Sequence, residues 1–131
     1  MPNLDVWAPR VLSLLRLIAA LLFLEHGLMK VFNFPAAQEG VPNPLPLMLV
    51  VAAWLEIVGG GLVALGLFTR PAAFLLSGQM AIAYFLAHAP ASFYPALNGG
   101  EPAILFSFVF LYLAAAGGGI WSLDALVRKR P

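Results

Sequence analysis

Apolar and polar positions alternate along the chain on a long scale, so that four extended apolar stretches are separated by short polar connections. The stretches run from Val11 to Phe32, from Leu47 to Phe68, from Ala72 to Ala89 and from Ala103 to Trp121. At about 1.5 Å per helical residue, each can cross the roughly 30 Å hydrocarbon core of a bilayer once. We therefore predict an all-α, integral membrane four-helix bundle that forms a single transmembrane domain over residues 1–131.

Composition supports a bilayer location, because 62% of the residues are hydrophobic and only 10% are charged. A soluble domain of this size with that composition would be expected to aggregate, so we expect the lipid bilayer to be a main partner. The first stretch also contains Glu25, His26 and Lys30, which the apolar region of a cleavable signal would not contain. We therefore expect this stretch to remain as a membrane span.

Two further counts limit the chemistry. The chain has no cysteine, which excludes disulfides, thiolate nucleophiles and cysteine-bound iron–sulfur clusters within it. The net charge of +1 gives no reason to expect a nucleic-acid partner.

The distribution of charge predicts the orientation of the spans. Four spans would place five basic residues on one side of the membrane: Arg10, Arg70, Arg128, Lys129 and Arg130. The opposite side would hold Lys30, Glu39 and Glu101. Because basic residues favour the cytoplasmic side, we predict that both the N- and C-termini are cytoplasmic.

The second stretch contains Glu56, a carboxylate that is costly near the middle of a membrane unless it is protonated, paired or beside a cavity. On a helix it shares a face with small residues: Ala52, Ala53, Gly59, Gly60, Val63 and Gly66. We interpret the glycines as packing positions, since small faces let helices approach closely in lipid. Glu56 itself is the first candidate functional residue.

Helical spacing places other polar side chains at a similar depth. We predict a polar pocket that opens to the outer face and is lined by Glu25, His26, Glu56, Tyr84 and His88. Lys30, Asn98 and Glu101 are expected at its mouth. In this hypothesis Glu56, Glu25 and His26 are catalytic, and the remaining residues bind the ligand.

Simpler interpretations of these residues stay open. Glu25 could pair with Lys30 or His26, and His88 could reach the interface as an amphipathic side chain. Near the cytoplasmic side, Arg16 and Asp124 are expected to form a structural pair that ties the first helix to the last.

Metal and haem sites are not favoured. Di-iron bundles use Glu-x-x-His, which puts both ligands on one helical face, whereas Glu25 and His26 are adjacent and point about 100° apart. A haem held by His26 and His88 would join two residues at different depths.

Five ordered segments resemble the DoxX family of small bacterial membrane proteins. They are residues 25–30 (EHGLMK), 54–60 (WLEIVGG), 65–70 (LGLFTR), 98–101 (NGGE) and 117–124 (GGGIWSLD), and the resemblance extends from Leu12 to Asp124. In the last segment the family often has a proline between or after the glycines, where this chain has Gly119 and Ile120.

The resemblance implies a four-helix, multi-pass protein of the bacterial inner (plasma) membrane. Members are associated with quinone-linked oxidation of sulfur compounds such as thiosulfate, or with redox complexes that serve detoxification. The motif positions are occupied here by Glu25, His26, Lys30, Glu56, Asn98 and Glu101.

We therefore expect a subunit of a quinone-linked membrane oxidoreductase, with a quinone as its ligand and a redox partner subunit, and with assembly into a homo-oligomer left open. Two alternatives are a non-catalytic scaffold that holds a partner and a permease for small solutes or ions.

Overall fold

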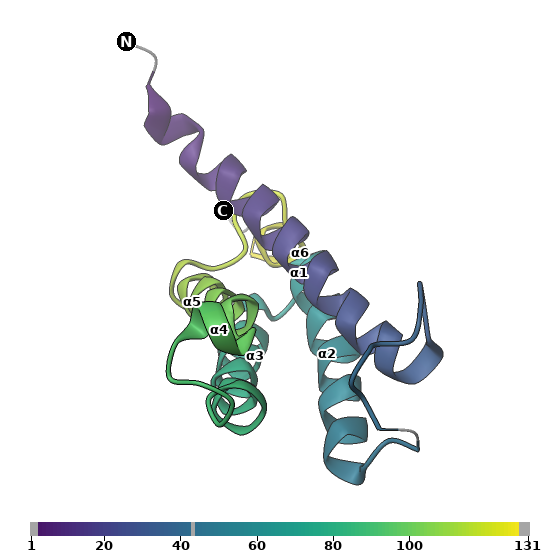
Figure 1. The fold of residues 1–131 in the computed structure, drawn as a ribbon. Coiled ribbons are helices and arrows are strands. Elements are labelled where there is room, and N and C mark those ends of the chain that lie inside the picture. The colour runs from purple at the N-terminus through teal and green to yellow at the C-terminus, as the bar shows by residue number, and fades with distance from the viewer. Residues whose placement is uncertain (1–2, 43, 129–131) are drawn as a thin grey trace.

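The computed structural model describes residues 3–42 and 44–128, and every regular element in this part of the chain is helical. The long helices are α1 (Ala8–Phe32), α2 (Leu47–Leu65), α3 (Thr69–Ala83) and α5 (Glu101–Ala116) (Figure 1). Short elements complete the fold: the 3-10 turn η1 (Leu4–Val6), the π-helical turn η2 (Tyr84–His88), α4 (Pro95–Asn98) and α6 (Leu123–Val127). The predicted all-α class is confirmed for these residues.

Three helical segments are long and apolar enough to cross a membrane: Leu4–Phe32, Leu47–Leu65 and Thr69–His88. The fourth helix, α5, has 16 residues, or about 24 Å. The prediction that this span continues to Trp121 is wrong at its C-terminal end. Gly117 (φ 86°) and Gly119 (φ 82°) adopt backbone conformations that favour glycine, and they end the helix.

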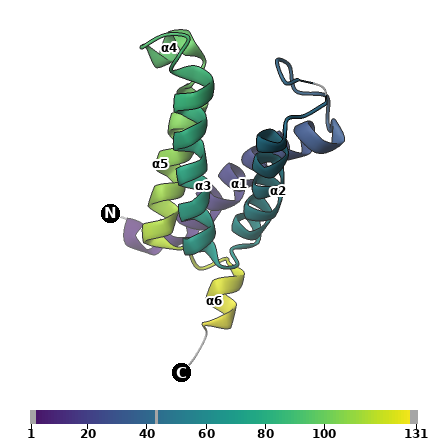
Figure 2. The ribbon, with the colours of Figure 1, turned by 90° about the horizontal axis from the view of Figure 1, so that it is seen from below.

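The four long helices associate as two pairs. α1 packs mainly against α2, and α3 packs mainly against α5, while the α2–α3 contact is smaller and α1 touches α5 only locally. Figure 2 shows α3 and α5 side by side, with α1 crossing behind them toward α2. The α3–α5 pair is joined by two serine bonds: Ser77 Oγ donates to the Ser107 carbonyl at 2.7 Å, and Ser107 Oγ donates to the Ser77 carbonyl at 3.0 Å.

The core lies where the pairs meet. Phe23 of α1 and Phe110 of α5 are fully buried with their ring centroids 4.9 Å apart, and Leu76, Val63 and Leu113 pack around them. The outward faces of the helices carry many large apolar side chains that are at least half exposed, such as Ile18, Val58 and Phe108. Such a surface suits contact with lipid acyl chains.

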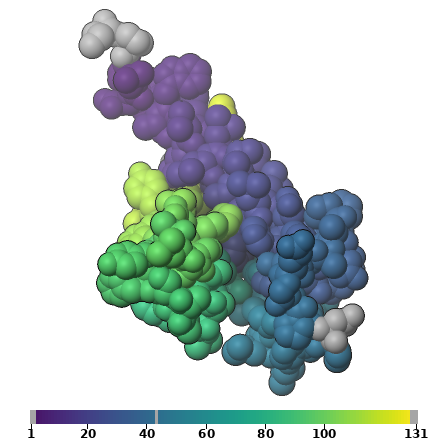
Figure 3. Space-filling view, viewed as in Figure 1, coloured from purple at the N-terminus to yellow at the C-terminus, as the bar shows by residue number. Residues whose placement is uncertain are grey.

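One end of the molecule gathers the start of α1, the end of α2, the start of α3 and the end of α5; we call it the basic end, because Arg10, Arg70 and Arg128 belong to it. Their expected grouping on one side is therefore seen, whereas Lys129 and Arg130 lie outside the described residues. The N-terminal turns of α1 project beyond the rest of the molecule here (Figure 3).

The predicted Arg16–Asp124 ion pair is not formed directly. Arg16 is buried, and its guanidinium donates to the carbonyls of Gly118, Trp121 (3.0 Å) and Ala64 (3.4 Å). The Asp124 carboxylate instead accepts hydrogen bonds from the backbone amides at the start of α3, Phe68 N and Thr69 N, each at 2.9 Å. Both residues tie the last segment to the earlier helices through backbone groups. For Asp124 these are amides that the start of α3 leaves unpaired.

Candidate ligand pocket and buried ion pair

A close approach of α1 and α2 sets the geometry of the candidate site. Gly27 lies directly against α2, and a Cβ atom there would be 2.9 Å from both the Ala53 carbonyl oxygen and the Glu56 Cβ. No side chain fits in that space, so the two helices can pack this closely only with glycine at this position. Lys30 follows Gly27 by three residues and therefore lies on nearly the same face of α1.

Lys30 uses this placement to pair with Glu56. Its Nζ lies 2.5 Å from Glu56 Oε1 and 2.8 Å from Oε2. The Glu56 side chain is 1% exposed, and that of Lys30 is 14% exposed. Pairing was one of the ways in which Glu56 could be accommodated, and the structure gives it as partner Lys30, which was expected at the mouth of the pocket.

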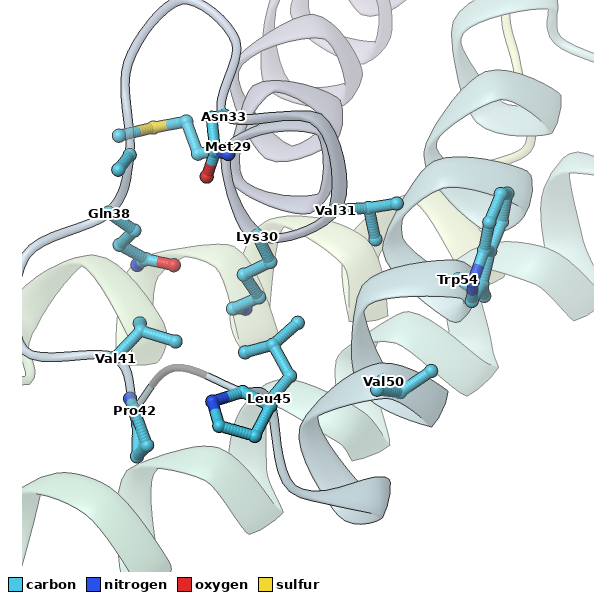
Figure 4. A pocket seen from close by; sticks show the side chains of 12 residues that line it. Met29, Lys30, Val31, Asn33, Gln38, Val41, Pro42, Leu45, Val50 and Trp54 are labelled. Atoms are coloured by element: carbon cyan, nitrogen blue, oxygen red, sulfur yellow. The ribbon is translucent and has the colours of Figure 1, made fainter.

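Lys30 also lines a pocket at the opposite end of the molecule from the basic end. This pocket, which we call the Lys30 pocket, has a volume of about 370 Å³ and lies between the end of α1, the 33–46 connection and the start of α2. Figure 4 shows the Lys30 side chain reaching into it, with Val50 and Trp54 on the α2 side. Its lining residues are Met29, Lys30, Val31, Asn33, Ala37, Gln38, Val41, Pro42, Pro44, Leu45, Val50 and Trp54. The mixture of apolar walls and a few polar groups is typical of small-molecule sites.

Gln38 adds an unused hydrogen-bond acceptor. Its Oε1 is buried and has no hydrogen-bond partner among the described residues. Figure 4 shows the Gln38 side chain extending from the connection toward the same space as Lys30. Since buried polar atoms are nearly always hydrogen-bonded, this oxygen is open to a donor such as a water molecule or a ligand.

Tyr84, His88 and Asn98 form a separate cluster on η2 and α4. Asn98 is buried, and its Nδ2 donates to Tyr84 Oη and to the Ser92 carbonyl, both at 3.0 Å. His88 Nδ1 lies 3.0 Å from the Asn98 carbonyl oxygen. None of the three lines the Lys30 pocket, so the single polar pocket predicted from depth is wrong. The physical reason is the pairing of α3 with α5, which joins η2 to the 92–100 segment and not to α1 and α2.

The other predicted site residues also lie outside the Lys30 pocket. Glu25 is exposed on α1 and makes no hydrogen bond or ion pair within the described residues. His26 Nδ1 lies 2.9 Å from the Leu22 carbonyl oxygen, and its ring lies edge-on to Phe106. Glu101 is exposed at the first turn of α5, where a carboxylate is favoured by the helix dipole.

Sequence reasoning missed Gln38 and Trp54, which come from the connection and from α2. The proline-rich run from Pro42 to Pro46 was a usable signal, since it cannot form a helix interior and must lie across the helix ends. The pattern does not show, however, which side chains of the connection face inward.

A known family model matches more than half of the chain. The DoxX family model matches residues 11–89, the part of the chain that carries Gly27, Lys30, Gln38 and Glu56. The chain belongs to the DoxX family.

Curated relatives cover nearly the whole chain. A Haemophilus influenzae protein described as uncharacterized is 45% identical over 95% of this chain and 96% of its own length. The Escherichia coli inner membrane protein YqjF is 30% identical over 88% of this chain and 90% of its own length. No solved structure matches the chain.

These findings agree on where this DoxX protein resides. Family membership, the inner-membrane relative and several apolar helices make it a multi-pass protein of an inner membrane, in contact with the lipid bilayer.

Proposed function

We propose that this DoxX protein is the quinone-binding subunit of a membrane oxidoreductase, and that the quinone head group occupies the Lys30 pocket. The observation that carries the proposal is a pocket of about 370 Å³ lined by Lys30 and Gln38. Lys30 is paired with the buried Glu56, which itself does not line the pocket, and Gln38 Oε1 has no hydrogen-bond partner among the described residues. Pockets of this size are suited to a single ring system.

The chemistry of the lining groups matches a carbonyl-bearing ring. Reduction of a quinone to its quinol takes two electrons and two protons. Lys30 Nζ can donate a hydrogen bond to a ring oxygen, and Gln38 Oε1 can accept one from a quinol hydroxyl. Trp54 and Val50 supply apolar surface for the ring. Glu56, held against Lys30, is the group that can pass protons to and from this site.

Electrons would come from a partner subunit. The DoxX resemblance suggests thiosulfate or another sulfur compound as the substrate oxidised there, or a role in detoxification. In this proposal the protein binds the quinone and manages its protons, while the redox partner supplies both electrons.

The test is a titration of purified protein with a short-chain quinone, followed by thermal unfolding. Binding to the folded state should raise the melting temperature in a saturable way. The same titration with the reduced quinol tests Gln38, whose Oε1 can accept a hydrogen bond only from a quinol hydroxyl. Gln38→Ala should raise the quinol concentration at half-saturation about threefold to tenfold, because this hydrogen bond is lost without disturbing the Lys30–Glu56 pair.

His26→Ala is the matched control, since His26 lies in α1 but does not line the Lys30 pocket. His26→Ala should leave the ligand concentration at half-saturation unchanged. A non-saturating shift, or an equal response in both variants, would reject the quinone site and favour a scaffold in which the ion pair only locks α1 to α2.

A further inference from the structure

A second cavity lies at the basic end, away from the Lys30 pocket. We call it the Arg70 pocket; it has a volume of about 250 Å³ and is bounded by the start of α1, the 117–120 glycine loop, α6 and Arg70 of α3. Its walls include Leu12, Arg70, Gly117, Ile120, Asp124 and Arg128. The quinone proposal makes no use of this cavity.

The Arg70 guanidinium is held in place within it. Arg70 Nη1 donates to the Ala115 carbonyl at 3.0 Å, and a Cβ added at Gly117 would lie 3.4 Å from Arg70 Nε and Nη2. The guanidinium therefore lies close to the loop at Gly117. Its remaining N–H groups bond to no acceptor in the part of the chain that the structure describes. An exposed guanidinium that is anchored by one hydrogen bond and keeps free donors favours binding of phosphate or carboxylate oxygens.

The charge balance of the cavity is positive. Arg128 is a second cationic wall residue, and its side chain makes no hydrogen bond or ion pair within residues 3–42 and 44–128. The acidic wall residue Asp124 is already engaged, because its two carboxylate oxygens accept from Phe68 N and Thr69 N. An anion in the cavity would therefore meet two arginines and one carboxylate, which keeps its charge and attracts Arg128 but whose oxygens already accept two hydrogen bonds.

The position of the Arg70 pocket and its apolar walls favour a phospholipid over a free phosphate ion. The cavity lies where α1 and α3 begin and α5 ends, which is the level expected for lipid head groups. Pro9, Leu12 and Ile120 give it an apolar side. Trp7 and Trp121, both more than half exposed at this end, are typical of the interfacial layer. A ligand with a charged phosphate and an acyl chain matches both sides of the cavity, whereas a free phosphate matches only the arginines.

We infer that the Arg70 pocket binds the phosphate group of an anionic phospholipid between Arg70 and Arg128, with an acyl chain along Leu12. The bound lipid would join α3, α6 and the start of α1 at the basic end. This site is independent of the Lys30 pocket and does not depend on the quinone proposal.

The test uses the full chain in nanodiscs of phosphatidylcholine, with and without phosphatidylglycerol. Phosphatidylglycerol should raise the melting temperature in a saturable way and should remain bound in native mass spectra. Arg128→Gln should raise the phosphatidylglycerol content needed for half of the melting-temperature shift about fivefold. Arg70→Gln should raise it by a similar factor. Because Arg70→Gln also removes the bond to Ala115, Arg128→Gln keeps the test valid if the first variant folds poorly.

Arg10→Gln is the matched control: Arg10 lies at the same end and bonds to the Val6 carbonyl, but it does not line the Arg70 pocket. If Arg10→Gln and Arg128→Gln reduced the stabilisation by phosphatidylglycerol equally, the inference would be overturned in favour of a diffuse attraction between the basic end and anionic lipid. Equal stabilisation by inorganic phosphate would show a soluble-anion site and would overturn the lipid assignment, as would no effect of phosphatidylglycerol. Gln38→Ala should leave the lipid effect intact, which separates this outcome from the quinone test.

Discussion

Glu56 is one of the most deeply buried charged residues in the described chain, and both its carboxylate oxygens face a single ammonium group. An ion pair of this kind pays a desolvation cost that mutual attraction roughly offsets, so its net contribution to stability is small. Removal of only one partner is different, because the other charge is then left buried and unpaired.

The first prediction follows from this asymmetry. Lys30→Met should destabilise the fold by about 3–5 kcal/mol, since it strands the Glu56 carboxylate among apolar groups. Glu56→Gln should cost less, because Lys30 is partly exposed toward the pocket and can find water there. The double variant Lys30→Met/Glu56→Leu should recover most of the loss. Thermal unfolding in detergent measures all three, and a Lys30→Met protein as stable as the wild type would show that the pair is not formed.

A second residue-scale prediction concerns Asp124, which lies outside the membrane-spanning helices. Partial burial alone would raise the pKa of Asp124, but hydrogen bonds from Thr69 and Phe68 and attraction to Arg128 outweigh it and lower the pKa below 3.8. A lowered pKa means that Asp124 stabilises the fold above its unfolded value and that this contribution is lost as pH falls through the folded value.

Asp124→Ala should therefore lower stability at pH 7 by about 0.5–2 kcal/mol, as expected for the loss of a helix cap. The gap between wild type and variant should narrow as pH falls below about 4. Thermal unfolding measured from pH 7 to pH 3 checks this, and a gap that widens toward acid would contradict the assigned role. Asp5→Ala, at an exposed N-terminal position, is the control.

At the scale of elements, hydrophobic runs predicted the existence and order of the four long helices well, because lipid contact leaves a simple signal. The hydrophobic runs predicted the ends of the helices less well: α5 ends at Ala116, whereas the fourth apolar stretch continues to Trp121. There the residues that follow remain largely apolar, and the helix ends because of backbone geometry at Gly117 and Gly119. The small-residue stripe of α2 was predicted as a packing face, and Gly59 and Gly60 do pack against Leu76 and Leu24.

The close packing of α1 on α2 depends on Gly27. Gly27→Ala should destabilise the protein by about 1–3 kcal/mol, because the added methyl group must push against the Ala53 carbonyl and Glu56. Gly61→Ala is the matched control, since a Cβ there would have no neighbour within 4 Å. It should be neutral or slightly stabilising, as alanine favours the helix. Equal effects of the two substitutions in thermal unfolding would show that the close packing at Gly27 is not present.

At the scale of the whole molecule, the sequence predicted only part of the candidate site. It identified Glu56 and Lys30, because charges in apolar stretches stand out. It could not predict which helices pair, since depth along a helix says nothing about which neighbour faces it. For that reason Tyr84, His88 and Asn98 were grouped with Glu56, although they pack together on the α3–α5 side.

Orientation in the membrane is the next whole-molecule prediction. Cysteines introduced singly at exposed Asn3, at the basic end, and exposed Glu39, at the opposite end, should react with an impermeant maleimide from opposite sides of the membrane. With the basic end cytoplasmic, only the Glu39→Cys protein should be labelled in intact cells. Labelling of Asn3→Cys from outside would reverse the assignment.

The central claim is that the Lys30 pocket holds the head group of a quinone, and photolabelling in native membranes tests it most directly. A photoreactive short-chain quinone should modify residues between Met29 and Trp54, and excess unmodified quinone should suppress this labelling in a saturable way. Gln38→Ala should reduce labelling by the probe in its reduced quinol form, and His26→Ala should not. Saturable labelling confined to residues 84–101, or labelling of residues 29–54 that excess quinone does not suppress, would contradict the account.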